Sequence, residues 1–272
     1  MPIKYGSTGV GAVYYGSTAI GRIYHGSTLV FDGAGGSVGG PTALVGYKIY
    51  KTDGTAAINV TTTGLSGGTT GDTEAKAGDL VVLVWAWAGD ADYSGASLSS
   101  DPGFTLRSDL LGSDTYRSRQ RVWTLTAASN APSVTVGSVY GITHGVAVAV
   151  VVLRNAEYAS HTTATRSNTY RPIPPSITPT TSGSWIFYFV NNAHTRNGGL
   201  SYTGQTDLTM LINETSASSA GSDTNADTTI GVGYNTDGTT DPFSQGEWTM
   251  GAANSSAYSS TSSAFEFSNI PA

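Results

Sequence analysis

The chain has 272 residues, of which 39% are hydrophobic and only 12% charged, and its formal net charge is −6 at pH 7. This length suits one large all-β domain or two small ones, and the acidic balance argues against a nucleic-acid binder, which needs clustered Lys and Arg. The absence of cysteine excludes disulfides and thiolate metal sites, and it favours assembly in a reducing cytoplasm.

The chain opens with a ten-residue repeat, read as "YGST" at 5–8 and 15–18 and as "HGST" at 25–28. Each copy predicts a strand of about seven residues closed by a Gly-Ser-Thr turn. Strands this few and this short, with apolar side chains on both faces, are not stable alone in water. We therefore expect residues 1–31 to be an attachment segment, with these contact residues: Ile3, Tyr5, Val10, Val13, Tyr14, Tyr15, Ile20, Ile23, Tyr24, His25 and Val30.

A Gly-rich linker, "DGAGGSVGGP" at 32–41, separates the repeat from the rest of the chain. Residues 35–39 match the serine-hydrolase pattern G-x-S-x-G. That motif needs a strand before it and a helix after it, and a glycine linker supplies neither. We interpret the match as chance.

Residues 42–272 are predicted to form one β-sandwich body. No long segment has apolar residues at helical spacing, and the expected strands are 45–50, 80–88, 119–126, 133–137, 145–153, 184–190, 229–234, 246–250 and 263–268. Residues 78–156 and 183–272 run through similar strands in the same order. This pattern predicts an all-β, two-sheet antiparallel sandwich, jelly-roll-like and built from two similar halves around one core, with the Pro-rich stretch 171–179 as the crossover between halves.

A search for catalytic or metal-binding patterns finds none that is specific. The four histidines, at 25, 144, 161 and 194, are not at metal-ligand spacing. The Asp-rich stretch 223–227 departs from a calcium loop, and no phosphate-binding loop is present. The glutamates are scattered, so no pair can be assigned as the two carboxylates of a glycosidase. We expect no metal, no cofactor and no enzymatic activity.

Aromatic and polar residues in predicted loops are candidates for sugar binding, because a flat ring stacks on the apolar face of a sugar while polar neighbours bind its hydroxyls. The tryptophans lie inside strand patterns and are assigned to the core, and ordinary surface exposure is the alternative for the loop residues. The candidate glycan contacts are Tyr93, Tyr116, His194, Arg196, Phe243 and Gln245.

Two stretches of the chain carry a resemblance to a known class of proteins. The N-terminal "YYGSTAIGRIYHGSTLVF" resembles the strand repeats that begin small virion proteins of tailed bacteriophages. The segments "GDLVVLVWAWAGD", "GFTLRSD", "RVWTLTAAS" and "GVAVAVVVLRNA" look like the β-sandwich of phage head-spike and tail-fibre proteins and of spikes of phage-like gene transfer agents. These motifs are structural, so no catalytic residue is carried over.

The resemblance implies a structural protein on the virion surface, assembled in the bacterial cytoplasm. Residues 1–31 would dock on a capsid or other virion protein, and the sandwich would contact a fibre protein or a host surface glycan such as capsular polysaccharide. The chain would form a homo-oligomer and bind neither nucleic acid nor membrane. Its shortness and lack of coiled coil favour a head spike; the alternatives are a tail-fibre or receptor-binding carbohydrate module and, third, a polysaccharide depolymerase.

Overall fold

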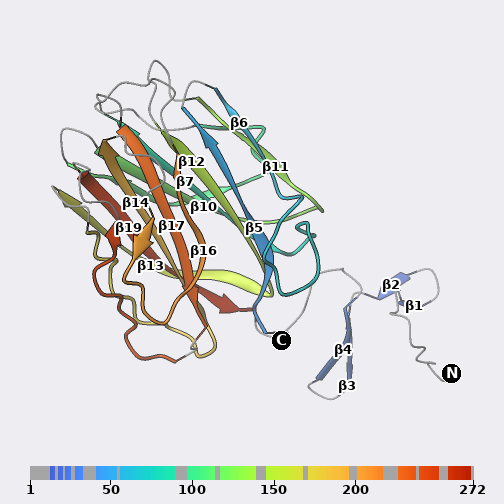
Figure 1. Cartoon of the computed structure of the whole chain (residues 1–272). Helices are drawn as coiled ribbons and strands as arrows, with labels where there is room; N and C mark the ends of the chain where they lie inside the picture. The colour runs from blue at the N-terminus through green and yellow to red at the C-terminus, as the bar shows by residue number, and fades with distance from the viewer. Residues whose placement is uncertain are drawn as a thin grey trace.

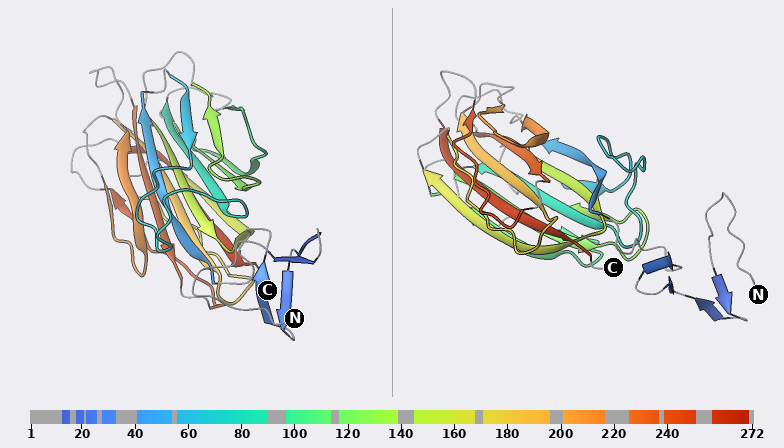
Figure 2. Two further views of the ribbon diagram at one scale, coloured as in Figure 1. Left: turned by 90° about the vertical axis from the view of Figure 1, so that its right-hand side faces the viewer. Right: turned by 90° about the horizontal axis from the view of Figure 1, so that it is seen from below.

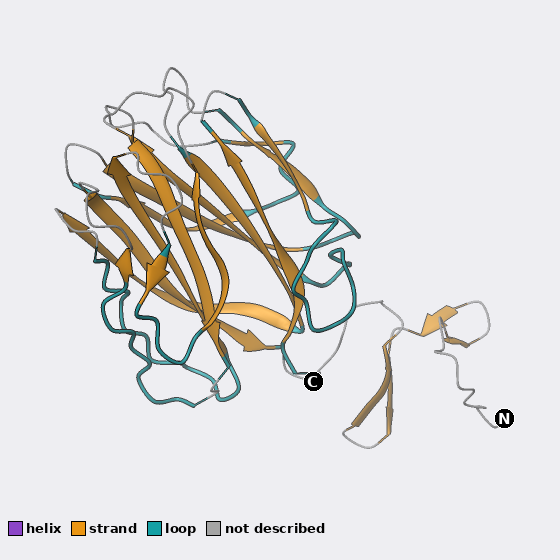
Figure 3. Ribbon diagram, viewed as in Figure 1, coloured by secondary structure: helices purple, strands orange, loops and turns teal. Residues whose placement is uncertain are grey.

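The computed structural model describes residues 13–15, 18–20, 22–25, 28–32, 41–53, 56–89, 97–113, 117–138, 145–167, 171–195, 201–216, 226–236, 239–250 and 257–270. Before residue 41, and at 195, 226, 257 and 258, only the backbone is described. All regular structure in these ranges is β-strand, which confirms the all-β prediction (Figure 3). Over the same ranges, no helix is long and apolar enough to cross a membrane.

Two five-stranded antiparallel sheets form the centre of the body (Figure 1). The first has the order β5-β12-β7-β10-β9 and contains β5 (Ala43–Thr52), β7 (Leu80–Gly89), β9 (Thr105–Leu111), β10 (Arg117–Thr126) and β12 (Val146–Arg154). The second has the order β13-β19-β14-β17-β16 and contains β13 (Ala156–Ser167), β14 (Trp185–Thr195), β16 (Thr209–Ser216), β17 (Ala226–Asn235) and β19 (Ala257–Asn269). Each sheet is thus made from one continuous half of the chain.

A smaller sheet accompanies each large one. In the first half it has the order β6-β11-β8 and consists of β6 (Ile58–Thr61), β8 (Leu98–Ser99) and β11 (Ser133–Val136). In the second half it consists of β15 (Tyr202–Thr203) and β18 (Thr249–Met250). An isolated β-bridge between Ile177 and Phe243 belongs to the same half of the chain. Except for β9 and β10, which are consecutive and both belong to the large sheet, the strands of the first half alternate between its two sheets along the chain, as in a jelly roll.

The two halves share one topology, which confirms the prediction of two similar, jelly-roll-like halves. If the five strands of each large sheet are numbered by their order in the sequence, both sheets have the spatial order first, fifth, second, fourth, third. The sheets face each other with β7 against β14, β10 against β19, β5 beside β16 and β9 beside β13. The first strand of each half thus neighbours the third strand of the other, which is the pairing of an approximate two-fold axis.

The boundary between the halves differs from the predicted crossover. β12 ends at Arg154 and β13 begins at Ala156, so Asn155, with a φ of 56°, is the only residue between the two large sheets. The Pro-rich stretch 171–179 lies inside the second half, where Ile177 pairs with Phe243. The prediction was wrong because β13 is polar along most of its length and gives no apolar strand signal.

The core is divided into three layers, whereas the sequence predicted one. The middle layer packs the two large sheets against each other through residues such as Val84, Val151, Phe187 and Phe265. The outer layers lie between each large sheet and its small sheet, with Trp85 and Trp87 in the first half and Trp248 in the second. Because both faces of β7 and β12 are covered, these strands are buried along nearly their whole length.

The interface between the large sheets changes from apolar to polar along its length. At one end, side-chain amides bond to main-chain carbonyls of the facing sheet: Gln120 Nε2 to Phe189 O at 3.1 Å and Asn191 Nδ2 to Arg119 O at 3.0 Å. Ser263 Oγ donates to Gln120 Oε1 at 2.6 Å. Because buried polar groups need defined partners, these bonds fix the register of one half against the other.

The N-terminal repeat forms two hairpins. β1 (Val13–Tyr15) pairs with β2 (Thr18–Ile20), and β3 (Arg22–His25) pairs with β4 (Thr28–Asp32). The described strands are shorter than the predicted seven residues, and the second and third Gly-Ser of the repeat fall in sequence between the two strands of a pair. Neither hairpin belongs to a large sheet, and both are drawn to one side of the body (Figures 1 and 2). Ile3, Tyr5 and Val10 lie outside the described residues.

Candidate functional site

The six predicted glycan contacts do not form one site in the described structure. Tyr93, Tyr116 and Arg196 lie outside the described residues. His194 was predicted in a loop, but it lies on β14 with no exposed surface, and its Nε2 is 2.8 Å from Thr229 Oγ1. The loop prediction for His194 is wrong, because β14 continues through "NNAHT" and covers the histidine within the outer layer.

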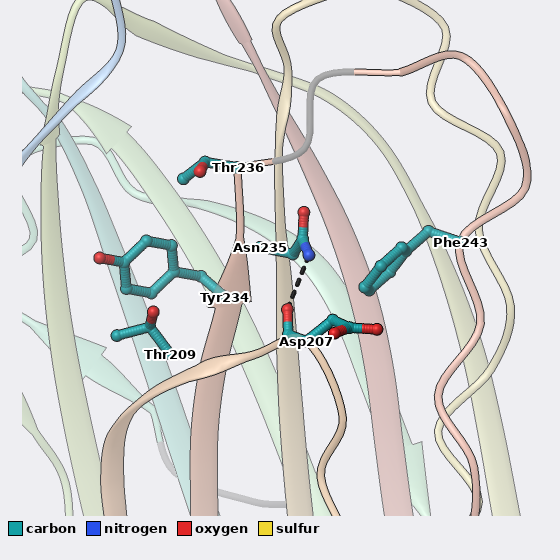
Figure 4. Close-up of a pocket in the computed structure, with 6 residues that line it drawn as sticks. All are labelled: Asp207, Thr209, Tyr234, Asn235, Thr236 and Phe243. Atoms are coloured by element: carbon teal, nitrogen blue, oxygen red, sulfur yellow. Dashed lines mark hydrogen bonds between the residues drawn. The ribbon is translucent and has the colours of Figure 1, made fainter.

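Phe243 and Gln245 are brought to one place, with different roles. Phe243 lines an open pocket of about 440 Å³ together with Asp207, Thr209, Tyr234, Asn235 and Thr236 (Figure 4). Gln245 is buried and bonds to the residue before Asp207: its Nε2 donates to Thr206 O at 2.7 Å, and its Oε1 accepts from Thr206 N at 3.2 Å. Gln245 therefore positions the segment before Asp207 and does not line the pocket.

Two aromatic rings border the pocket, and in Figure 4 they lie on opposite sides of Asp207 and Asn235. Tyr234 packs in the middle layer and Phe243 in the outer layer, so the rings belong to opposite faces of the second large sheet. Tyr234 is stacked on Trp185 with ring centroids 5.1 Å apart and on Phe187 at 5.2 Å, so its ring is held by the middle core layer. Phe243 is held by its paired main-chain bonds with Ile177 and by contact with the Tyr188 ring at 5.9 Å. Both rings are half-buried and fixed from behind, which lowers the entropy cost of a contact with a ligand.

Asp207 lies between the rings in an uncommon backbone conformation. Its φ is 56°, in the left-handed region where glycine is usual and Asp is tolerated. Asn235 Nδ2 donates to Asp207 O at 2.6 Å, which ties the turn to the end of β17. In Figure 4 the carboxylate of Asp207 extends to the side on which Phe243 lies.

The polar groups that line the pocket include the carboxylate of Asp207 and the hydroxyls of Thr209, Tyr234 and Thr236. Asp207, Thr209 and Thr236 are exposed, and within the described part of the chain their side chains have no hydrogen-bond or ion-pair partner. None of the six lining residues is basic, and Asp207 is the single acid among them. This set can accept hydrogen bonds from hydroxyl groups of a ligand and donate to them beside the Phe243 ring, whereas a glycosidase centre requires a second carboxylate.

The duplicated fold supplies an internal comparison for this pocket. β17 ends with Tyr234 and Asn235 and is followed by Thr236, while the corresponding strand β10 ends at Thr126 and is followed by Ala127 and Ala128. Ala127 is buried in the first outer layer and bonds to the main chain of Asp79 and Gly78. The fold therefore does not require the aromatic and polar set, which is particular to the second half.

Other charged groups in the body are engaged in structural contacts. Arg154 Nε and Nη2 bond to the two carboxylate oxygens of Asp79 at 2.9 and 3.0 Å, and its Nη1 bonds to Asp72 at 2.6 Å. Glu266 is fully buried and receives only neutral donors, including Ser184 Oγ at 2.8 Å. These are the networks expected where charges lie beside closely packed layers.

His161 lies outside the pocket, at the seam between the two halves. Its Nδ1 is 2.7 Å from Tyr158 Oη, and the Arg107 guanidinium lies 4.2 Å from the centre of the Tyr158 ring. Burial and the nearby Arg107 charge lower the pKa of His161. Among the residues whose positions are described, no group of three or more His, Cys, Asp or Glu side chains could hold a metal ion.

Comparison with protein-family models, curated proteins and solved structures gave no match to this chain. Function is therefore argued from the fold and from the pocket. Of the pocket residues, the sequence indicated only Phe243. Asp207, Thr209 and Tyr234 come from segments that the pairing of β16 with β17 brings together, and no local motif marks them.

Proposed function

We propose that this chain is a structural protein of the virion surface, a head-spike or fibre component, that attaches to the particle through residues 1–31 and displays the double jelly-roll body. The observation that supports this proposal best is the pairing of the N-terminal hairpins. β1 pairs with β2 and β3 with β4, and neither hairpin joins a large sheet. Isolated two-stranded hairpins are marginal in water, so a partner surface completes them.

In the body, in contrast, both faces of each large sheet are covered by other parts of the same chain. Each has the opposite large sheet on one face and a small sheet on the other. The hairpins are then the part of the chain that needs a neighbour, which in this proposal is a capsid or other virion protein, or a sister copy in a homo-oligomer. The body is left to contact a fibre protein or a host surface glycan.

The test compares the full chain with two variants in the producing cell. One lacks residues 1–40, and the other replaces residues 13–32 with a Gly-Ser linker of equal length, which keeps the spacing. We expect both bodies to unfold at the temperature of the full chain, because the large sheets begin at Ala43, and to be absent from purified particles. Incorporation of either variant at the level of the full chain would refute the attachment role.

A second candidate function, a tail-fibre or receptor-binding carbohydrate module, is favoured by one specific observation. The pocket places Phe243 beside the carboxylate of Asp207, and sugar sites combine such an aromatic ring with hydrogen-bonding groups. The third candidate, a depolymerase, gains no support from this pocket, because Asp207 has no second carboxylate beside it among the lining residues. The two supported functions are compatible, since a displayed body can also bind a glycan.

A further inference from the structure

We infer that the pocket lined by Asp207, Tyr234 and Phe243 binds a neutral hexopyranosyl unit of a glycan and rejects acidic sugars. This inference deepens the glycan contact in the proposed function and rests on it for its biological setting. Three features of the pocket support it: its size and shape, the fixed ring of Phe243, and the sign of its charge.

The size and shape fit a sugar unit. A volume of about 440 Å³ is within the range of small-molecule sites. The pocket is open to solvent, which leaves room for the next units of a chain to extend outward. Phe243, which lies on the side toward which the Asp207 carboxylate extends (Figure 4), offers an apolar surface to the C–H face of a pyranose ring, and its ring is held in place by Tyr188.

The polar groups match vicinal hydroxyls. The carboxylate of Asp207 can accept two hydrogen bonds from neighbouring hydroxyls, and the hydroxyls of Thr209 and Thr236 can donate or accept. Hydrogen bonds to a charged acceptor are stronger than neutral ones, so Asp207 supplies most of the polar recognition. The turn that carries it is fixed by Asn235 and Gln245, which keeps the carboxylate in place before the ligand arrives.

The charge sets the specificity. A uronic or sialic acid brings a second carboxylate to a pocket that contains Asp207 and no basic lining residue. The formal net charge of −6 on the whole chain also repels an anionic ligand. Like charges at close range disfavour binding, and such a mismatch is a common means of excluding a partner. Neutral hexoses carry no such penalty.

The test uses the full chain and measures binding by titration calorimetry and ligand-observed NMR. The probes are neutral oligosaccharides of glucose, galactose and mannose, and matched oligosaccharides that contain uronic acid. We expect saturable binding of at least one neutral probe and at least tenfold weaker binding of its acidic counterpart. Phe243→Ala should weaken the neutral interaction about tenfold, because it removes the stacking surface beside the Asp207 carboxylate.

Two charge variants separate recognition from folding. Asp207→Asn keeps a residue that tolerates a positive φ and should weaken neutral binding while reducing the preference over acidic probes. Asp101→Asn removes an equal charge from an exposed turn of the first half, where Asp101 Oδ1 accepts from Gly103 N and Phe104 N, and should leave binding unchanged. Each variant is first shown to unfold at a temperature within a few degrees of the parent chain.

The inference is overturned if no neutral probe binds, if acidic probes bind as well as neutral ones, or if Asp207→Asn and Phe243→Ala bind like the parent chain. None of these results bears on the proposed attachment role, which is assigned to residues 1–31. Conversely, a chain without residues 1–40 should keep its sugar binding even though it is lost from particles.

Discussion

Replacing Glu266 with Gln tests how much of the stability of the second half depends on one buried charge. Glu266 Oε1 accepts from Thr180 N at 2.8 Å, Thr181 N at 3.1 Å and Ser184 Oγ at 2.8 Å. Its Oε2 accepts from Ser160 Oγ at 2.8 Å and Thr180 Oγ1 at 2.9 Å. The carboxylate therefore joins the Thr180–Ser184 turn to the large sheet.

The expected magnitude follows from the donors. A hydrogen bond to a charged group contributes about 1.5–3 kcal/mol, against about 0.5–1.5 kcal/mol for a neutral one. Gln can keep its carbonyl toward the two main-chain N–H groups and its amide toward the hydroxyls, and it avoids the cost of burying a charge. We expect Glu266→Gln to lower the free energy of unfolding by about 2 kcal/mol at pH 7. Glu266→Ala leaves two N–H groups unpaired and should cost about 4 kcal/mol.

The loss should also depend on pH. Burial raises the pKa of Glu266, but the hydrogen bonds from Ser184, Ser160 and Thr180 outweigh it and hold the pKa below its usual value. The charge therefore stabilises the fold fully above the unfolded pKa, about 4.3, and this stabilisation is lost as pH falls through the folded pKa. The difference in the free energy of unfolding between the parent chain and Glu266→Gln should therefore decrease from pH 7 to pH 3.

The assay is urea unfolding followed by tryptophan fluorescence at pH 7, 5, 4 and 3. Other carboxylates with lowered pKa, such as Asp109 beside Arg119 and Arg121, are present in both proteins and cancel in the difference. Glu247→Gln is the control, because Glu247 is exposed and pairs with Arg171 at the surface; it should change stability by less than about 1 kcal/mol. A difference in the free energy of unfolding that is constant with pH, or a Glu266→Gln protein that is more stable than the parent chain at pH 7, would refute the reasoning.

Two further substitutions test the packing of the halves. Phe187→Ala removes a fully buried ring that contacts Phe189 and Phe267 in the middle layer, and it should cost about 3–5 kcal/mol in urea unfolding; a loss below about 1 kcal/mol would show that the layer repacks freely. Arg154→Met leaves the nearly buried Asp79 without its paired cation and should cost about 3 kcal/mol, of which Asp79→Asn in the same chain should restore part. If the double variant is no more stable than Arg154→Met, the charge on Asp79 is not the cause.

Apolar strands were predictable from the sequence, and polar ones were not. "LVVLVWAWA" and "GVAVAVVVL" are apolar on both faces and became β7 and β12, the covered strands beside each other in the first large sheet. β13, in contrast, is an edge strand with the sequence "AEYASHTTATRS" and has no apolar alternation. Its pairing with β19 over eleven positions comes from main-chain bonds and from the turn at Asn155, which a search for periodicity does not detect.

The same limit applies to the candidate site. Phe243 was indicated because "DPFSQGE" is a predicted loop that contains an aromatic residue. Tyr234 was assigned only to a strand, and Asp207 was given no binding role, because their places in the pocket depend on where β16 pairs with β17 and on the bridge at Ile177. His194 shows the opposite error, since a polar sequence that is typical of a loop lies in a buried strand.

Because both jelly rolls lie on one polypeptide, their association does not depend on protein concentration, as it does for separate subunits. A dimer of two chains dissociates on dilution, whereas here the second roll stays at the local concentration set by the single residue Asn155. A substitution in one roll is also not copied into the other, as it would be between identical subunits. The end of β17 can therefore carry the polar and aromatic residues of the pocket while the end of β10 keeps the residues that maintain the fold.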